Sequence, residues 1–394
     1  MSSPVGAPVP LTAFLPGDWR RAQFLGRMDF GAGPTPVLLR GGHLFDLSGL
    51  APTVADLLNG LDDGTVPQGG HDLGPADAIH VARQWEAALP GAPLLLAPID
   101  LQCIKAAGVT FAVSALERVI EERARGDAAR ANEIRANLNA RIGTDLRAVK
   151  PGSADAARLK QALIADQLWS QYLEVAIGPD AEIFTKGPTL SAVGWGAHIG
   201  VRADSDWNNP EPELVLAVDG RGRVHGATLG NDVNLRDFEG RSALLLSKAK
   251  DNNASCALGP FIRLFDRDFT LDDVRVAAVT VQVTGEDGFT LDGHSTMSLI
   301  SRDPLDLVGQ TIGRHHQYPD GFVLFMGTLF APIDDRDAPG QGFTHKRGDI
   351  VTIASPRLGS LTNRVVPCDE APPWQFGIGD LMRNLARRGL LPAA

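Results

Sequence analysis

Residues 207–218 read Trp207-Asn208-Asn209-Pro210-Glu211-Pro212-Glu213-Leu214-Val215-Leu216-Ala217-Val218. The apolar end of this segment predicts a β-strand, and strand side chains alternate with a period of two, so Glu211 and Glu213 point to the same side. Asp232 follows a second apolar run, residues 224–229. Asp219-Gly220, between the two runs, is the dipeptide of a tight hairpin, so the strands are neighbours and Asp232 returns to the end where the glutamates lie.

These three acids suit a divalent cation. Mg²⁺ and Mn²⁺ are hard cations that prefer carboxylate and water oxygens. Without a cation, carboxylates at close range repel one another and raise each other's pKa. An isolated E-x-E step is more often a solvated strand face, but the hairpin and the nearby cation Lys250 favour a metal site. We therefore predict that Glu211, Glu213 and Asp232 bind Mg²⁺, with Mn²⁺ as an alternative.

The composition is that of a globular protein with no nucleic-acid partner. Of the 394 residues, 44% are hydrophobic and 21% are charged, and the formal net charge is −10, so no basic stripe is expected. The N-terminus has no basic region followed by an apolar run, and no apolar segment reaches the roughly 18 residues of a membrane span. The three cysteines lack metal-type spacing and are expected to be reduced thiols. We expect a cytoplasmic protein that binds a small molecule, without a membrane partner.

The pattern along the chain predicts an α+β fold in three parts: a small α/β module (1–100), a helical lid and linker region (101–180) and a larger β domain (181–394). In the first part we expect a strand over residues 36–40 that pairs with residues 44–45, and a helix that begins after its cap Thr53. A further helix is expected over residues 74–89. In the second part, helical spacing continues from Leu116 to Ile142, and Ser153 caps a helix that continues to Val175.

The third part has short apolar runs between Gly, Pro and Asp turns, which predicts a mixed or antiparallel β domain. The predicted strands are residues 181–184, 198–201, 214–218, 224–229, 275–283, 321–325 and 349–353.

A series of motifs follows in order along the chain: Glu211-Pro212-Glu213, Asn231-Asp232, Arg236-Asp237, Lys250 and Gly259-Pro260-Phe261. In this order they resemble the core of the fumarylacetoacetate hydrolase superfamily, and the likeness extends from near Pro98 to near Val365. The resemblance implies a mixed β-roll catalytic domain, Mg²⁺ held by the three acids, and a homodimer or higher homo-oligomer.

Residues 106–111, 202–207 and 249–260 resemble one group within the superfamily, the 2-keto-3-deoxy-pentonate dehydratases. Hydrolases of the superfamily carry a His-x-x-Glu pair on a mobile lid, shortly after an aromatic residue, and this pair activates a water molecule. After Phe111 this chain has Ser114 and Glu117 at the corresponding positions. Because the histidine is missing, the resemblance favours elimination of water over hydrolysis of a C–C bond.

The implied reaction is Mg²⁺-dependent dehydration of a 2-keto-3-deoxy-pentonate to 2-oxoglutarate semialdehyde, in non-phosphorylative pentose catabolism. The 2-keto acid would chelate Mg²⁺, which acidifies the protons on C3. We expect Lys250, with a pKa lowered by burial beside a cation, to transfer the proton at C3 or to stabilise the enolate. Glu117 or Glu121 is expected to protonate the departing C4 hydroxyl. Substrate contacts are expected from Thr328, Lys186, Arg236 and Ser114.

Two alternatives stay open. One is a hydrolase of a 2,4-diketo acid or acylpyruvate that uses the same metal with a different acid–base pair. The other is a non-catalytic protein of the same fold that binds a keto acid. Such a protein could lose its acid triad without harm, so the intact triad speaks against this second alternative.

Overall fold

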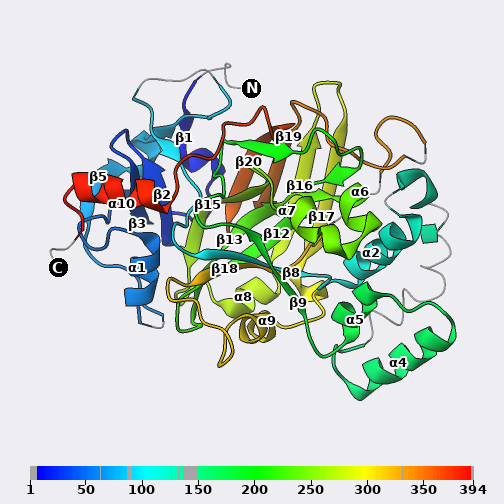
Figure 1. Ribbon diagram of the computed structural model, residues 1–394. Helices are drawn as coiled ribbons and strands as arrows, with labels where there is room; N and C mark the ends of the chain where they lie inside the picture. Colours follow the sequence, from blue (N-terminus) through cyan, green and yellow to red (C-terminus); the bar gives the residue numbers. More distant parts are fainter. Residues whose placement is uncertain are drawn as a thin grey trace.

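Two β-sheets form the frame of the computed structural model, which describes residues 7–62, 64–86, 91–125, 127–131, 134–135, 149–330, 332, 334–339 and 341–391 (Figure 1). The strands of the larger sheet are β2 (Phe24–Asp29), β3 (Pro34–Arg40), β4 (His43–Asp46), β5 (His71–Pro75), β7 (Leu94–Leu95), β8 (Cys103–Gly108), β9 (Glu182–Gly187), β12 (Pro212–Val218), β13 (Val224–Asp232), β15 (Cys256–Leu264) and β18 (Phe322–Phe325). The strands of the smaller sheet are β10 (His198–Val201), β16 (Ala278–Thr284), β17 (Thr290–Thr296), β19 (Ile350–Ser355) and β20 (Gly359–Pro367).

The strand order places β12 and β13 near the middle of the larger sheet, which runs β5-β4-β3-β2-β15-β13-β12-β18-β8-β9 with β7 paired to β2. The smaller sheet runs β10-β20-β19-β16-β17. The predicted combination of strands and helices is therefore confirmed. The division of the chain at residues 100 and 180 stays a prediction.

The main apolar core lies between the two sheets. Leu214 and Leu216 of β12 belong to one buried cluster with Val281 of β16 and Ile353 of β19. Val215, the residue between the two leucines, belongs to a second buried cluster on the other face of the larger sheet. β12 is thus buried on both faces, which explains its continuous apolar run and places the E-x-E step inside the protein.

The first hundred residues extend the larger sheet, because β2 pairs with β15 through Leu25 and Ile262. The predicted hairpin is confirmed as β3 and β4, and helix α1 (Val54–Gly60) begins after Thr53, whose side chain accepts a hydrogen bond from the Asp56 N–H. The predicted helix over 74–89 is wrong for residues 74–86. Gly74 has φ +106°, β5 pairs with β4, and β6 (His80–Val81) pairs with β1 (Val9–Pro10), so tertiary pairing overrides the local helical pattern. Residues 87–90 lie outside the described residues.

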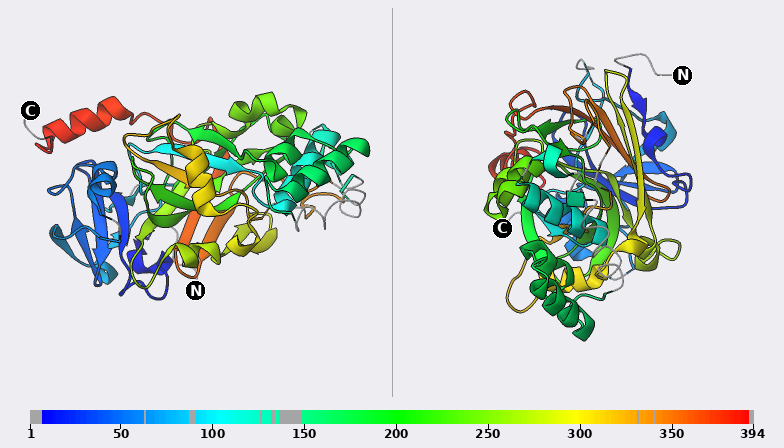
Figure 2. Two further views of the ribbon diagram at one scale, coloured as in Figure 1. Left: turned by 90° about the horizontal axis from the view of Figure 1, so that it is seen from below. Right: turned by 90° about the vertical axis from the view of Figure 1, so that its right-hand side faces the viewer.

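Helices α2 (Ala112–Ala124), α4 (Ala154–Ala165) and α5 (Gln171–Ile177) gather at one end of the molecule, opposite α1 and the C-terminal helix α10 (Ile378–Arg387), as Figures 1 and 2 show. Ser153 caps α4 as predicted, but the single helix predicted as far as Val175 is wrong. α4 ends at Ala165, Gln167 adopts φ +57°, and Ser170 caps a new helix. The helical spacing predicted towards Ile142 ends outside the described residues.

The strands predicted in the third part are confirmed with one change. Residues 275–277 are not part of β16, because Arg275 ends the short helix α8 (Leu271–Arg275) and the strand begins at Ala278. The Asp219-Gly220 hairpin joins β12 to β13, with Glu213 opposite Gly230 in the ladder. Among the described residues, no helix is long and apolar enough to cross a membrane.

Candidate active site

The hairpin brings the three predicted metal ligands together. Glu211 lies just before β12, Glu213 lies in it, and Asp232 ends β13. One carboxylate oxygen of each lies within 4.8 Å of the other two, and all three side chains are buried. The backbone supports the arrangement, since the Asp232 N–H donates to the Glu211 carbonyl oxygen at 3.1 Å. Three buried carboxylate oxygens at this spacing fit the donor set that Mg²⁺ or Mn²⁺ prefers.

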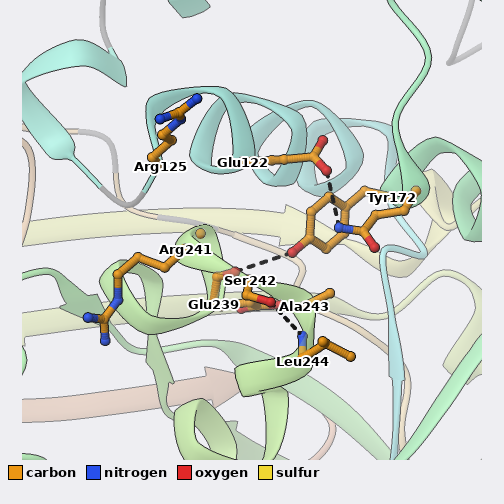
Figure 3. A pocket seen from close by; sticks show the side chains of 10 residues that line it. Glu122, Arg125, Tyr172, Glu239, Arg241, Ser242, Ala243 and Leu244 are labelled. Atoms are coloured by element: carbon orange, nitrogen blue, oxygen red, sulfur yellow. Dashed lines mark hydrogen bonds between the residues drawn. The ribbon is translucent and has the colours of Figure 1, made fainter.

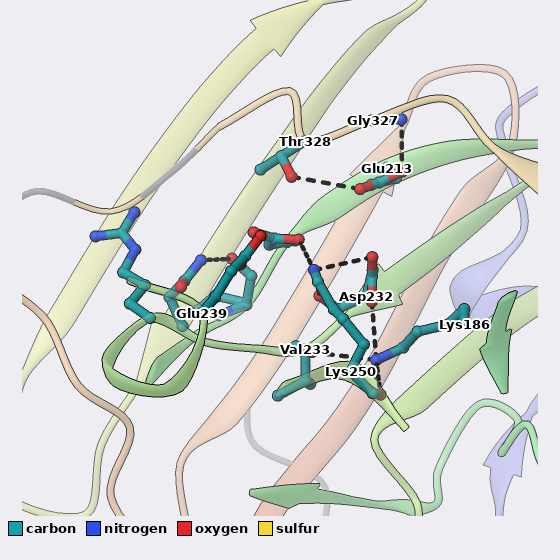
Figure 4. A network of polar contacts seen from close by, with 12 residues as sticks. Lys186, Glu213, Asp232, Val233, Glu239, Lys250, Gly327 and Thr328 are labelled. Carbon is teal, nitrogen blue, oxygen red and sulfur yellow. Dashed lines mark hydrogen bonds and ion pairs between the residues drawn. The ribbon is translucent and has the colours of Figure 1, made fainter. Parts of the chain in front are cut away.

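Glu213 shows how strongly the cluster needs a positive charge. Burial and the charges of Asp232 and Glu211 hold the pKa of Glu213 well above its usual range. Two donors from the loop after β18 orient its carboxylate: the Gly327 N–H at 2.7 Å and the Thr328 hydroxyl at 3.4 Å (Figure 4). The predicted substrate contact Thr328 therefore lies at the edge of the cluster. Gly327 has φ +101°, and a Cβ there would lie 1.9 Å from Thr110 Oγ1, so only glycine fits.

Lys250 ends helix α7 (Leu246–Lys250) and lies between two of the acids. Its Nζ donates to Glu211 and, at 3.0 Å, to Asp232 (Figure 4). Burial acts to lower the pKa of Lys250, but the charges of Asp232 and Glu211 outweigh it, and the net shift is upward. The lowered pKa is expected beside a bound cation, whereas the carboxylates by themselves shift the pKa of Lys250 upward. These carboxylate contacts favour the ammonium form of Lys250, and its role in proton transfer at C3 stays a prediction.

Lys186 lies on the far side of Asp232. Its Nζ is 2.8 Å from Asp232 Oδ1 and donates to the carbonyl oxygens of Val233 at 3.1 Å and Lys250 at 2.5 Å. Two of its three protons go to these carbonyl oxygens, and the contact with Asp232 is an ion pair. Lys186 is fully buried and is not among the residues that line the cavity beside the cluster. In this arrangement Lys186 holds Asp232, and its expected contact with substrate stays a prediction.

Arg118 of α2 is a site residue that the sequence interpretation missed. Its Nη2 donates to Glu211 Oε1 at 2.5 Å, and its Nη1 lies 2.7 Å from Glu121 and 3.1 Å from Glu239. Burial acts to raise the pKa of Glu211, but Lys250 and Arg118 outweigh it and lower that pKa to about 2. Both oxygens of Glu211 are thus bound by cations from the chain itself.

Glu182 of β9 is a second residue that was missed. It lines the same cavity as the acid cluster, and no hydrogen bond or ion pair restrains its carboxyl group within the described part of the chain. Burial, with a further contribution from the charge of Glu239, raises the pKa of Glu182 to about 7. The strand over residues 181–184 was predicted, but an acid at the start of a strand gives no local sign of function in the sequence.

The two lid acids do not reach the cavity. Glu117 forms a two-point ion pair with Arg135, with both N–O distances 2.8 Å, and its pKa is lowered because this pair outweighs burial. Glu121 lies 2.7 Å from Arg118 and 3.1 Å from Nε of Arg236; burial raises its pKa. Neither glutamate is among the cavity-lining residues, so the structure does not bring either predicted proton donor to the cluster.

Arg236 and Ser114 also lie behind the cavity wall. Arg236 is fully buried, pairs with Glu121 and donates to the Pro332 carbonyl oxygen at 2.9 Å. Ser114 is buried in α2. Neither lines the cavity beside the acids, and their roles as substrate contacts stay predictions. The cavity itself has about 10 Å³ of free volume, roughly the room of one water molecule.

A larger pocket of about 600 Å³ adjoins this cavity and shares Glu239 with it (Figure 3). It lies between the end of α2, α5 and residues 239–244, and it carries Arg125 and Arg241 together with Glu122. Tyr172 of α5 donates from its hydroxyl to the Glu239 carbonyl oxygen at 3.4 Å. Glu239 therefore lines both the cavity beside the acid cluster and this larger, polar pocket.

The fold and the carboxylate cluster place the chain in a known class of proteins. The sequence profile described as fumarylacetoacetate (FAA) hydrolase C-terminal matches residues 136–366, more than half of the chain, so this chain belongs to the fumarylacetoacetate hydrolase family.

Two curated relatives define the likeness further. The chain is 32% identical over 187 residues to "2-dehydro-3-deoxy-D-arabinonate dehydratase" of Saccharolobus solfataricus, covering 47% of this chain and 58% of that protein. It is 33% identical over 199 residues to "Probable 2-keto-3-deoxyxylonate dehydratase" of Haloferax volcanii, covering 49% and 63%. The chain thus matches only about three fifths of the length of these relatives.

Solved structures share the fold. One, "2-keto-3-deoxy-D-arabinonate dehydratase complexed with magnesium and 2,5-dioxopentanoate", superposes with a TM-score of 0.60 at 21% identity, covering 88% of this chain and 99% of that one. The apo form of the same enzyme gives a TM-score of 0.60 at 20% identity with the same coverage.

Proposed function

We propose that this chain is a Mg²⁺-dependent dehydratase that converts a 2-keto-3-deoxy-pentonate into 2-oxoglutarate semialdehyde and water. The observation that carries the proposal is the buried cluster of Glu211, Glu213 and Asp232, which Lys250 contacts and whose cavity Glu182 also lines. The names of the two curated relatives support this reaction, as does the magnesium complex with 2,5-dioxopentanoate, which is the same compound as the semialdehyde.

The acid cluster would bind the cation, with Mn²⁺ as an alternative to Mg²⁺. When bound, the cation would polarise the keto group of the substrate and acidify the protons on C3. Gly327 and Thr328 orient Glu213, and Lys186 orients Asp232, so the ligand oxygens are held before substrate arrives. Such outer contacts typically affect metal affinity about 10-fold to 100-fold.

We assign proton transfer at C3 to Glu182 in place of Lys250. A general base works best with a pKa near the working pH, and the pKa of Glu182 is about 7. Its carboxylate takes the C3 proton, and the carboxylic acid so formed then donates that proton to the C4 hydroxyl, which leaves as water. Tautomerisation of the unsaturated keto acid gives the semialdehyde. One carboxyl group therefore serves both steps, and no lid acid is needed.

Lys250 keeps its ammonium form and stabilises the negative charge that develops on the substrate oxygen as C3 loses its proton. Glu117, Glu121 and Arg236 are reassigned to positioning, because none of them lines the cavity: Glu117 pairs with Arg135, and Glu121 pairs with Arg118 and Arg236. They hold α2 in place. Ser114 takes the position at which related hydrolases carry the histidine that orients a hydrolytic water. Without that histidine, hydrolysis of a C–C bond is disfavoured.

We further propose the setting of the reaction: non-phosphorylative pentose catabolism in the cytoplasm, with the chain assembled as a homodimer or higher homo-oligomer. The semialdehyde product is an aldehyde, which an oxidation to 2-oxoglutarate would consume. Light scattering after size-exclusion chromatography would check the assembly directly, and a monomer at micromolar concentration would contradict it.

The test compares two substrates on the same protein preparation. With Mg²⁺ and a 2-keto-3-deoxy-pentonate we expect an aldehyde that forms a hydrazone, and no pyruvate. With a 2,4-diketo acid we expect no cleavage. Pyruvate formed from the diketo acid, without aldehyde from the sugar acid, would favour the hydrolase. Chelation of Mg²⁺ and the Glu213→Ala change are both expected to abolish the dehydration.

A further inference from the structure

We propose that Arg118 is a substrate-binding residue that exchanges partners: it binds Glu211 before a cation is loaded and the carboxylate of the 2-keto acid afterwards. The inference rests on the proposed function, because it requires a cation site at Glu211 and a 2-keto acid as substrate. It adds a residue of helix α2 to the substrate contacts, and it couples loading of the cation to binding of the substrate.

The first step concerns Glu211, whose two oxygens are both occupied. Oε1 accepts from Arg118 Nη2 at 2.5 Å, and Oε2 accepts from Lys250 Nζ. A carboxylate that becomes a ligand of a divalent cation has to give one of these oxygens to it. Cation binding at this cluster is therefore in competition with ion pairs that the chain makes to itself.

The second step concerns what holds Arg118 once Glu211 is released. Its Nη1 remains bound to Glu121 at 2.7 Å and lies 3.1 Å from Glu239. The guanidinium thus stays in the cavity wall, with Nη2 towards the cluster. The side chain is only 8% exposed, so the released donor has little access to water and needs a new acceptor.

The third step identifies that acceptor. The cavity is lined by five carboxyl groups, Glu182, Glu211, Glu213, Asp232 and Glu239, and by two cationic side chains, Arg118 and Lys250. An anionic substrate in such surroundings needs a cationic donor of its own, and guanidinium matches a carboxylate in shape and hydrogen-bond pattern. With about 10 Å³ free, the cavity admits a substrate only if an existing contact opens. The Arg118–Glu211 pair is the contact whose opening also supplies the donor.

The experiment measures two equilibria by calorimetry, with no turnover involved. The first is Mg²⁺ binding to the metal-free protein. The second is binding of pyruvate to the Mg²⁺-loaded protein. Pyruvate keeps the carboxylate and keto group of the substrate but has only a methyl group beyond them. In Arg118→Met we expect Mg²⁺ to bind roughly threefold to tenfold tighter, since a competitor for Glu211 is gone, and pyruvate to bind at least about tenfold weaker.

Two further variants keep the test sharp. Arg118→Lys retains the charge but loses the planar donor fork, so we expect Mg²⁺ affinity near that of wild type and weaker pyruvate binding. Arg302→Lys is the matched control: it is a buried arginine bound by the carbonyl oxygens of Val175 and Gly178 at the end of α5, and we expect neither affinity to change. Circular dichroism melts identify any variant that does not fold, and Arg118→Lys then carries the test.

The opposite signs of the two effects distinguish the exchange from a structural role. Loss of both affinities in Arg118→Met, or unchanged pyruvate binding in both Arg118 variants, would overturn the inference while leaving the proposed function intact. Wild-type protein that binds neither Mg²⁺ nor pyruvate would overturn the proposed function, and this inference with it.

Discussion

Gly108 and Glu182 face each other across the β8–β9 ladder, and the carboxylate of Glu182 fills the space that a side chain on residue 108 would need. A Cβ on residue 108 would lie 2.0 Å from Glu182 Oε2. Both residues line the cavity beside the acid cluster. The glycine therefore sets where the proposed base lies, although it contributes no functional group.

Gly108→Ala is expected to displace the Glu182 carboxylate and lower kcat, because a misplacement of about 1 Å can cost roughly 100-fold in rate. The carboxylate ends a flexible side chain that can move aside, so we expect the thermal unfolding midpoint to change little. Gly309→Ala in helix α9 (Pro304–Thr311) is the control, since nothing lies within 4 Å of a Cβ there. Unchanged kinetics in Gly108→Ala would contradict the role of Glu182.

Glu182→Gln keeps the shape of the side chain and removes its ability to accept a proton. We expect kcat/KM to fall by roughly 100-fold to 10,000-fold, the usual contribution of general acid–base catalysis. In wild type, the free enzyme is active with Glu182 deprotonated, so kcat/KM should rise with pH through a midpoint of about 7 or lower, since bound Mg²⁺ lowers the pKa. This acid limb should disappear in Glu182→Gln. A limb that persists at the same pH would assign the titration to another group.

Glu213→Gln tests the cation site without an assay of turnover. We expect Mg²⁺ to bind at least about tenfold weaker, because one charged ligand is lost. In wild type, Mg²⁺ affinity should increase with pH, because the raised pKa of Glu213 means that a proton has to leave before the cation binds. Glu122→Gln, in the neighbouring pocket, is the control and should bind Mg²⁺ as wild type does. Equal affinities in both variants would refute the ligand assignment.

Asp349 forms a buried ion pair with Arg336, which lies in the loop after β18. Its carboxylate lies 2.5 Å and 2.7 Å from the Arg336 guanidinium and 3.1 Å from His345 Nδ1. Asp349→Asn leaves the buried Arg336 charge with only the longer, partly exposed contact to Asp287, so we expect a loss of about 3 kcal/mol in the free energy of unfolding. Asp287→Asn, at the exposed end of the same network, should change the unfolding midpoint much less.

The pH dependence of that pair has a definite sign. Burial acts to raise the pKa of Asp349, but Arg336 and His345 outweigh it and lower the pKa to about 2. A lowered folded-state pKa stabilises the protein above the unfolded value of about 3.9, and this stabilisation is lost as the pH falls towards 2. Wild type should therefore lose stability between about pH 4 and pH 2 more steeply than Asp349→Asn, as acid unfolding curves would show.

The sequence by itself determined the hairpin and the acid cluster at its end. Strand alternation, the Asp219-Gly220 turn and the apolar runs of β12 and β13 are local properties, and they suffice to bring Glu211, Glu213 and Asp232 together. Two helix starts could also be predicted from the sequence. Thr53 and Ser153 precede helices because their side chains accept hydrogen bonds from N–H groups in the first turn.

Only the tertiary structure decided which groups reach that cluster and in what protonation state. Arg118 and Glu211 are 93 positions apart, and their contact depends on how α2 packs against α5 and against α6 (Arg236–Arg241). The same packing turns Glu117 and Glu121 towards arginines and leaves Glu182 at the cavity. The pKa of Lys250 is shifted upward because two carboxylates lie beside it in the folded chain. Charge and burial act through distance in the folded molecule, and a sequence pattern carries no such distances.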